Sequence, residues 1–157
     1  MTKKIFKTTV IIGILALALV AAGCGGGGGG VQRISGLPAD GVVKAFYDSA
    51  KADRLKEAAL YVSPASTSNP GTVIKYLTGQ NGLKELKASN LLSLREVAQQ
   101  GNYAAVVATL QTEQNSMKVT VKPVGLEKID GEWYIVDFDK IYADAKYSVL
   151  QRLLSDI

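Results

Sequence analysis

Few side chains in this 157-residue sequence could do acid–base or nucleophilic chemistry. Histidine is absent, which excludes Ser-His-Asp and Cys-His catalysis and every histidine-ligated metal site. Cys24 is the single cysteine, so neither an intrachain disulfide nor a thiolate cluster for zinc can form. Asp137, Asp48 and Tyr47 are the kind of residues that could serve in acid–base chemistry. Because the commonest general base is missing, we expect a noncatalytic protein without cofactor or metal.

Cys24 ends an N-terminal segment that has the pattern of an export signal. Three lysines within the first seven residues precede the apolar run Val10–Ala22, which is shorter than the roughly 20 residues needed to span a bilayer. The sequence Ala21-Ala22-Gly23-Cys24 resembles the lipobox of bacterial lipoproteins, although Leu is usual where Ala21 stands. The resemblance implies that residues 1–23 are a signal peptide and that Cys24 receives a diacylglyceryl group.

Lipidation would attach the protein to a cell membrane, on its periplasmic or extracellular side. Two alternatives remain, namely a secreted protein cut after Ala22 with a free thiol, and an uncleaved short membrane anchor. Six consecutive glycines, Gly25–Gly30, have maximal backbone freedom and predict a flexible tether within residues 24–36.

The net charge excludes one class of partner. The formal charge of +4 includes the three lysines of the signal, and removing them leaves 15 basic and 14 acidic side chains. A nearly neutral mature protein lacks the clustered basic face of a nucleic-acid-binding domain. We expect no nucleic-acid partner.

Residues 37–157 have the length of one domain and begin with helical patterns. Pro38 and Asp40 suit the start of a helix, whose apolar stripe includes Phe46 and Tyr47. A second helix is expected after Asp53, ending near Ser63-Pro64. Residues 65–71 form a polar loop, and short helical turns are expected at residues 72–77 and 83–86.

The pattern then changes to that of strands. Residues 91–99, 103–112 and 133–138 predict three strands, the second interior to a sheet because both of its faces are apolar. In residues 117–122 apolar side chains alternate with polar ones, which predicts a strand whose Met117, Val119 and Val121 are buried. The solvated side would then carry Lys118, Thr120 and Lys122.

Turn signals separate these strands. Gln100-Gly101-Asn102, Gln114-Asn115-Ser116 and Asp130-Gly131 predict turns, the last a tight hairpin. Pro123 and Gly125 are expected to interrupt the third strand, for example as a bulge.

The C-terminal residues 140–154 predict one amphipathic helix with Tyr142, Ala145, Val149 and Leu153 on its apolar face. Helices, then an antiparallel meander of about four strands, then a helix, predict an α+β fold with helices packed on a curved sheet.

Three segments carry a family resemblance. The stretch Val43–Asp53, the stretch Gly101–Val106 and the hairpin Asp130–Val136 are similar to small bacterial lipoproteins with a nuclear transport factor 2-like fold. The chain is thereby similar to the domain of unknown function 4878 group over residues 37–138. The resemblance implies a cone-shaped sheet wrapped on helices, often enclosing a pocket, and it implies no reaction.

Aromatic side chains could line such a pocket, or they could be ordinary core residues with polar tips. They are Phe46, Tyr47, Tyr61, Tyr103, Trp133 and Tyr134. Two hypotheses follow. The first is a binding or assembly module for a small apolar ligand, an envelope protein or a second copy in a homodimer. The second is an isomerase or dehydratase that uses a pocket Asp/Tyr pair.

Overall fold

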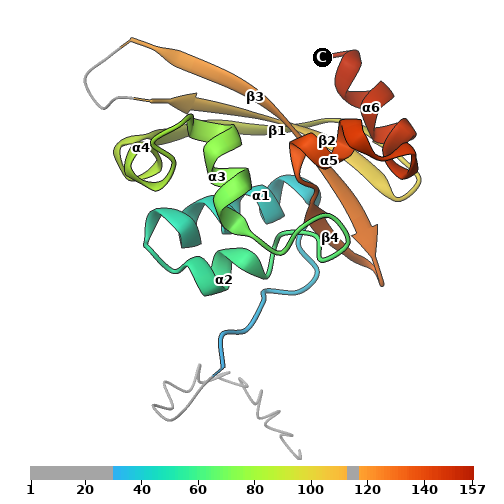
Figure 1. The fold of residues 1–157 in the computed structure, drawn as a ribbon, viewed down its shortest axis with the longest axis horizontal. Helices are drawn as coiled ribbons and strands as arrows, with labels where there is room; N and C mark the ends of the chain where they lie inside the picture. Colours follow the sequence, from blue (N-terminus) through green and yellow to red (C-terminus); the bar gives the residue numbers. More distant parts are fainter. Residues whose placement is uncertain (1–29, 113–116) are drawn as a thin grey trace, which may run out of the picture.

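The computed structural model describes residues 30–112 and 117–157, which form an α+β fold around a four-stranded antiparallel sheet in the order β1-β2-β3-β4 (Figure 1). This fold class is confirmed. The strands are β1 (Asn90–Gln100), β2 (Tyr103–Gln111), β3 (Val119–Ile129) and β4 (Glu132–Ile135). The helices are α1 (Ala39–Lys51), α2 (Leu55–Ala59), α3 (Pro70–Thr78), α4 (Leu83–Ala88), α5 (Phe138–Ala143) and α6 (Ser148–Ser155), with a 3₁₀ turn η1 (Ala145–Tyr147).

The two faces of the sheet are covered by different parts of the chain. Even-numbered residues of β2, such as Val106 and Leu110, pack in one apolar cluster with α1, α3 and α4. Ala105 points to the other face, where it packs with Tyr147 and Leu150 of the C-terminal segment. The two clusters, with the side chains packed against them, come entirely from residues 37–154. The domain therefore carries its own core, which is expected to form without residues 1–23.

The C-terminal segment is not the single helix that the sequence predicts. It breaks at Asp144, whose side chain accepts a hydrogen bond from the backbone N of Lys146 at 2.9 Å and starts η1. Since Ser, Asp and Asn side chains compete for backbone hydrogen bonds, they favour helix starts over helix interiors. The predicted apolar face is also wrong, because Tyr142 and Ala145 are exposed. The buried positions are instead Ile141, Tyr147, Leu150 and Leu154.

The first half of β3 is oriented opposite to the prediction. Val119 and Val121 are 52% and 56% exposed, and Met117 before them is fully exposed, whereas Thr120 and Lys122 are half-buried on the side of α3. Alternation shows that two faces differ, but a shift of one residue exchanges them. Ile141 and Leu150 lie over Gly125 on β3, whereas Val119 and Val121 farther along the strand stay exposed.

Pro123 and Gly125 lie inside β3 without interrupting it, which corrects the predicted bulge. The register from Tyr103↔Glu127 to Gln111↔Val119 has no shift. Proline is tolerated because β4 pairs with β3 only from Leu126 onward, so β3 is an edge strand at Pro123.

Other local signals gave correct elements. Asp130 and Gly131 both have positive φ, 50° and 86°, as a two-residue type I′ hairpin requires. The turn at Gly101 is also confirmed, whereas residues 114–116 fall in the range that the structure leaves out. Helix α2 stops at Ala59, earlier than expected, since Val62 forms a bridge with Ile135 instead.

Part of the segment that precedes the domain is fixed on it. Arg33 Nη1 lies 2.6 Å from Glu132 Oε2, its Nη2 donates to the carbonyl of Trp133, and its guanidinium lies 4.4 Å from the ring centre of Tyr134. The backbone N of Gly36 donates to the same carboxylate at 2.9 Å, and this bond, with that of Arg33, lowers the pKa of Glu132. The chain is therefore attached to the domain from Arg33 onward.

Candidate functional site

Asp137 lies at the junction of β4 and α5, where the chain leaves the sheet. Its side chain is buried and accepts a hydrogen bond from the backbone N of Asp139 at 3.0 Å, which caps α5. Its own backbone N donates to Ser66 Oγ at 3.2 Å. The loop before α3 is thus tied to the start of α5.

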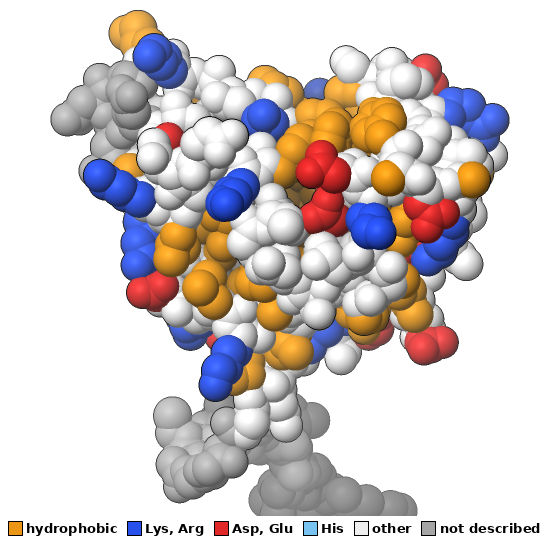
Figure 2. Space-filling model, in the orientation of Figure 1, with side chains coloured by type: hydrophobic (Ala, Val, Ile, Leu, Met, Phe, Trp, Pro, Cys, Tyr) orange, Lys and Arg blue, Asp and Glu red, His pale blue; other side chains and the backbone are white. Residues whose placement is uncertain are grey.

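Two adjoining hollows open at this junction and share Thr72, Asp137 and Asp139. Together they are called the Asp137 hollow. The first, of about 240 Å³, is also lined by Lys75, Tyr76 and Phe138. The second, of about 370 Å³, is also lined by Ser66, Thr67, Lys140 and Ala143. Figure 2 shows acidic side chains beside an apolar recess on this side of the molecule. The combination of apolar walls with a few convergent polar groups is typical of small-molecule sites.

An aromatic stack forms one wall of the first hollow. The rings of Tyr76 and Phe138 lie 4.2 Å apart and nearly parallel at 16°, and Phe138 meets Tyr142 at 5.1 Å. The Tyr76 hydroxyl donates to the carbonyl of Pro123 at 2.6 Å, and burial raises the pKa of this phenol well above 10. Since its proton is already engaged, Tyr76 supplies a rigid apolar surface here and no free acid.

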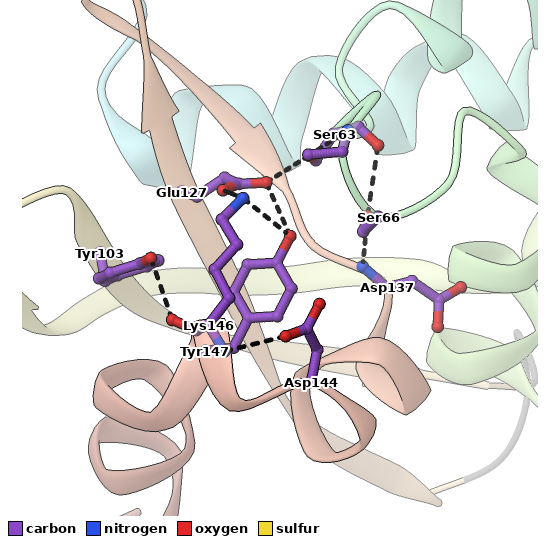
Figure 3. Close-up of polar contacts among 9 residues, drawn as sticks. Ser63, Ser66, Tyr103, Glu127, Asp137, Asp144, Lys146 and Tyr147 are labelled. Carbon is purple, nitrogen blue, oxygen red and sulfur yellow. Dashed lines mark hydrogen bonds and ion pairs between the residues drawn. The ribbon is translucent and has the colours of Figure 1, made fainter.

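A second polar cluster surrounds Glu127, which is buried on β3 (Figure 3). Its Oε1 accepts from Ser63 Oγ and from the Tyr147 hydroxyl, the latter at 3.0 Å. Its Oε2 accepts from Lys146 Nζ at 2.8 Å. Tyr103 packs edge-on against Tyr147, with ring centres 6.3 Å apart. Both carboxylate oxygens are occupied, so the cluster holds the C-terminal segment on the sheet.

The charges of this cluster shift two pKa values. The hydrogen bond from Lys146 to Glu127 is the main cause that raises the pKa of Lys146. Burial, followed by the nearby Glu127 charge, raises the pKa of Tyr147. Each shift favours the protonated form of its group in the folded protein.

Hydrogen bonds connect the two clusters. Ser63, which donates to Glu127, offers its carbonyl to Ser66 Oγ at 3.3 Å, and Ser66 Oγ accepts from the backbone N of Asp137 (Figure 3). This chain of hydrogen bonds therefore connects Glu127 with Ser66 and Asp137, which line the hollow.

The six aromatic residues singled out from the sequence lie elsewhere. Phe46, Tyr47, Tyr61 and Trp133 are buried in the cluster under α1. Tyr103 packs on the opposite cluster, and Tyr134 stacks under Arg33. The lining of the Asp137 hollow includes none of them. Sequence reasoning missed Thr72, Tyr76 and Phe138, although Thr72 and Tyr76 are four residues apart in a helical pattern and so share a face.

The carboxylate and phenol candidates are not brought together. Asp48 is exposed on α1 and pairs with Lys44 at 2.6 Å. The Tyr47 hydroxyl donates to the carbonyl of Ser89 at 3.0 Å. Asp137 alone borders the hollow. An Asp/Tyr pair with a free phenol is therefore not formed by these three residues.

Cys24 and the signal segment fall outside the described residues. Within residues 30–112 and 117–157, no three His, Cys, Asp or Glu side chains gather in a way that could hold a metal ion. In the same ranges, every helix is too short or too polar to cross a bilayer.

No protein-family model matches the chain, and neither the curated proteins nor the solved structures contain a match to it. The resemblance to the domain of unknown function 4878 group, carried by three sequence segments, therefore stays a prediction.

Proposed function

We propose that the chain is a lipid-anchored protein of the bacterial cell envelope that presents a noncatalytic binding domain on the periplasmic or extracellular side. Cys24, directly after a basic and apolar export signal, carries the anchor. The hollow around Asp137 carries the binding. It would take a small, mostly apolar molecule with one hydrogen-bond donor, because its walls are apolar and Asp137 supplies an acceptor.

The isomerase or dehydratase alternative has less support. It needs a carboxylate base beside a phenol that can donate to substrate. In the Asp137 hollow the phenol of Tyr76 already donates to Pro123, and in the Glu127 cluster both carboxylate oxygens are occupied. Neither pair has a free acid and a free base at the same time.

Two further parts of the proposal concern fold and assembly. A meander of four antiparallel strands with helices before it supports a nuclear transport factor 2-like, cone-shaped sheet. The exposed Val119 and Val121 on β3 are the surface that an envelope protein or a second copy would cover.

The anchor is tested by the intact mass of the protein recovered from the membrane fraction. We expect residues 24–157 plus two or three acyl chains for the natural sequence, and loss of both the acyl mass and membrane association for Cys24→Ser. Gly26→Ser is the matched control, which changes the tether by one hydroxymethyl group and should remain acylated. An unacylated chain that begins at Gly23 in the soluble fraction would contradict the anchor.

The hollow is tested with indole, which combines an apolar ring with one N–H donor. In ¹H–¹⁵N spectra, indole is expected to shift the amides of residues 72–76 and 137–143 with a Kd of roughly 1 mM, as suits a ligand of this size. Thr72→Trp fills the hollow and should abolish the shifts. Thr109→Trp, on the outer face of β2 opposite Val121, should leave them unchanged. Shifts that persist in Thr72→Trp would exclude this hollow as the site.

A further inference from the structure

Several apolar side chains are exposed at the end of the domain where the chain enters it. Val31, Ile34 and Leu55 are 48%, 57% and 37% exposed. Val31 and Leu55 line one hollow of about 390 Å³ with residues 53–57, and Ile34 borders another of about 260 Å³ beside Leu37. Single exposed apolar residues are ordinary. Here Val31 and Leu55 share one hollow and Ile34 borders the next, where the chain enters the domain beside α2 (Figure 1).

The distance from this end to the proposed anchor is short. Arg33 is fixed by Glu132 and Trp133, and Val31, two residues before it, follows Cys24 by only seven positions in the sequence. At roughly 3.5 Å per residue, fully extended, this stretch spans about 25 Å. A lipid on Cys24 would keep Val31 within that distance of the bilayer and give the surface a high effective concentration near it.

The charged residues around these apolar side chains are largely neutralised in pairs. Lys44 pairs with Asp48 at 2.6 Å, and Arg54 pairs with Glu57 at 2.7 Å. Asp53 pairs with Lys87 at 2.9 Å. With Lys56, which also lines the first hollow, the two linings carry three basic and three acidic side chains. They present no excess of basic charge to attract anionic lipid, so burial of apolar area must supply the attraction to a bilayer.

We propose that this end is a membrane-contact surface, on which Val31, Ile34 and Leu55 enter the headgroup boundary of the bilayer. The proposal rests on the lipid anchor at Cys24 and adds a second attachment that fixes the orientation of the domain. α5, which borders the Asp137 hollow, lies away from the chain entry (Figure 1), so contact of this end with a bilayer would leave the hollow open to water.

The test uses chain 24–157 with a maleimide lipid coupled to Cys24, bound to phosphatidylcholine vesicles with brominated acyl chains. Bromine quenches tryptophan only inside the bilayer. Each variant adds a second tryptophan to Trp133. The fluorescence that Leu55→Trp adds is expected to be quenched at least threefold more than the fluorescence that Leu92→Trp adds. Leu92 is a matched control, since it is 53% exposed but lies on β1 of the sheet. Equal quenching at the two positions would overturn the proposal.

Two further arms test the apolar origin of the contact. Adding Ile34→Asp to Leu55→Trp should reduce the quenching to the Leu92→Trp level, and 0.5 M NaCl should leave the quenching unchanged. Quenching abolished by salt would overturn the apolar mechanism. Because the lipid is coupled chemically, the result does not depend on acylation in the cell. A native chain without acyl groups would refute the proposed anchor in the separate mass experiment.

Discussion

Replacing Glu127 by Ala is expected to lower the free energy of unfolding by about 3 kcal/mol, measured by urea denaturation. The substitution removes the acceptor for Ser63, Tyr147 and Lys146 at once. The side chain of Lys146 is 45% exposed and can regain water, but the hydroxyls of Ser63 and Tyr147 stay buried without this partner. Their desolvation is the main cost.

Asp48→Ala is the matched control, because it also removes one carboxylate of a Lys pair but on an exposed helix face. Exposed pairs of this spacing contribute about 0.3–0.5 kcal/mol, so little change is expected. A Glu127→Ala variant no less stable than Asp48→Ala would show that the C-terminal segment is not held by this cluster.

The Glu127 cluster also predicts that the free energy of unfolding depends on pH in the alkaline range. The pKa values of Lys146 and Tyr147 are both raised by folding, so the folded state binds these protons more tightly than the unfolded chain. Their contribution is fully present below the unfolded pKa values, about 10 for both groups, and is lost as the pH rises through the folded values. Since Glu127 is the main cause of the Lys146 shift, the loss of stability above pH 10 should be shallower in Glu127→Ala.

Gly125→Val is expected to destabilise the protein by about 2–3 kcal/mol and to loosen α5 and α6 from the sheet. A Cβ at Gly125 would lie 2.7 Å from Ile141 Cδ1 and 2.8 Å from Leu150 Cδ2. Both neighbours are fully buried and have little room to move. Thermal unfolding measures the loss, and faster amide exchange in residues 138–155 would locate it.

A double substitution is the control for this prediction. Leu150→Ala removes one of the two clashing side chains and leaves a cavity, so it is destabilising alone. Combined with Gly125→Val, it should cost clearly less than the sum of the two single changes, because the added valine fills part of that cavity. Strict additivity would mean that Gly125 and Leu150 do not share a packing contact.

Features that depend on interactions between nearby residues could be predicted from the sequence. The apolar stripe of α1, the turn at Gly101 and the hairpin at Asp130-Gly131 depend on residues within a few positions of each other. The predicted lipobox that ends at Cys24 is a linear pattern of the same kind, and so is the succession of helices and strands that indicates an α+β fold.

Features that depend on which element covers a face of the sheet could not be predicted from the sequence. Glu127 stands between Leu126 and Lys128 in a strand, where a charged residue normally faces solvent. It is buried because residues 146–147, about 20 positions later, fold back over it. Likewise, alternation in residues 117–122 is compatible with either face being inside. The short α6 decides the matter by covering Gly125 and leaving Val119 and Val121 exposed.

The sequence by itself therefore determined the α+β fold class and the turns at Gly101 and Asp130-Gly131, since each is encoded in neighbouring residues, and it predicts the export signal in the same way. Only the tertiary structure decided the hollow around Asp137, because Ser66, Thr72 and Asp137 come from three separate segments. It also decided that Arg33 fixes the end of the tether, through a carboxylate 99 positions away. Contacts between distant residues depend on how every intervening element packs, and no local pattern records that packing.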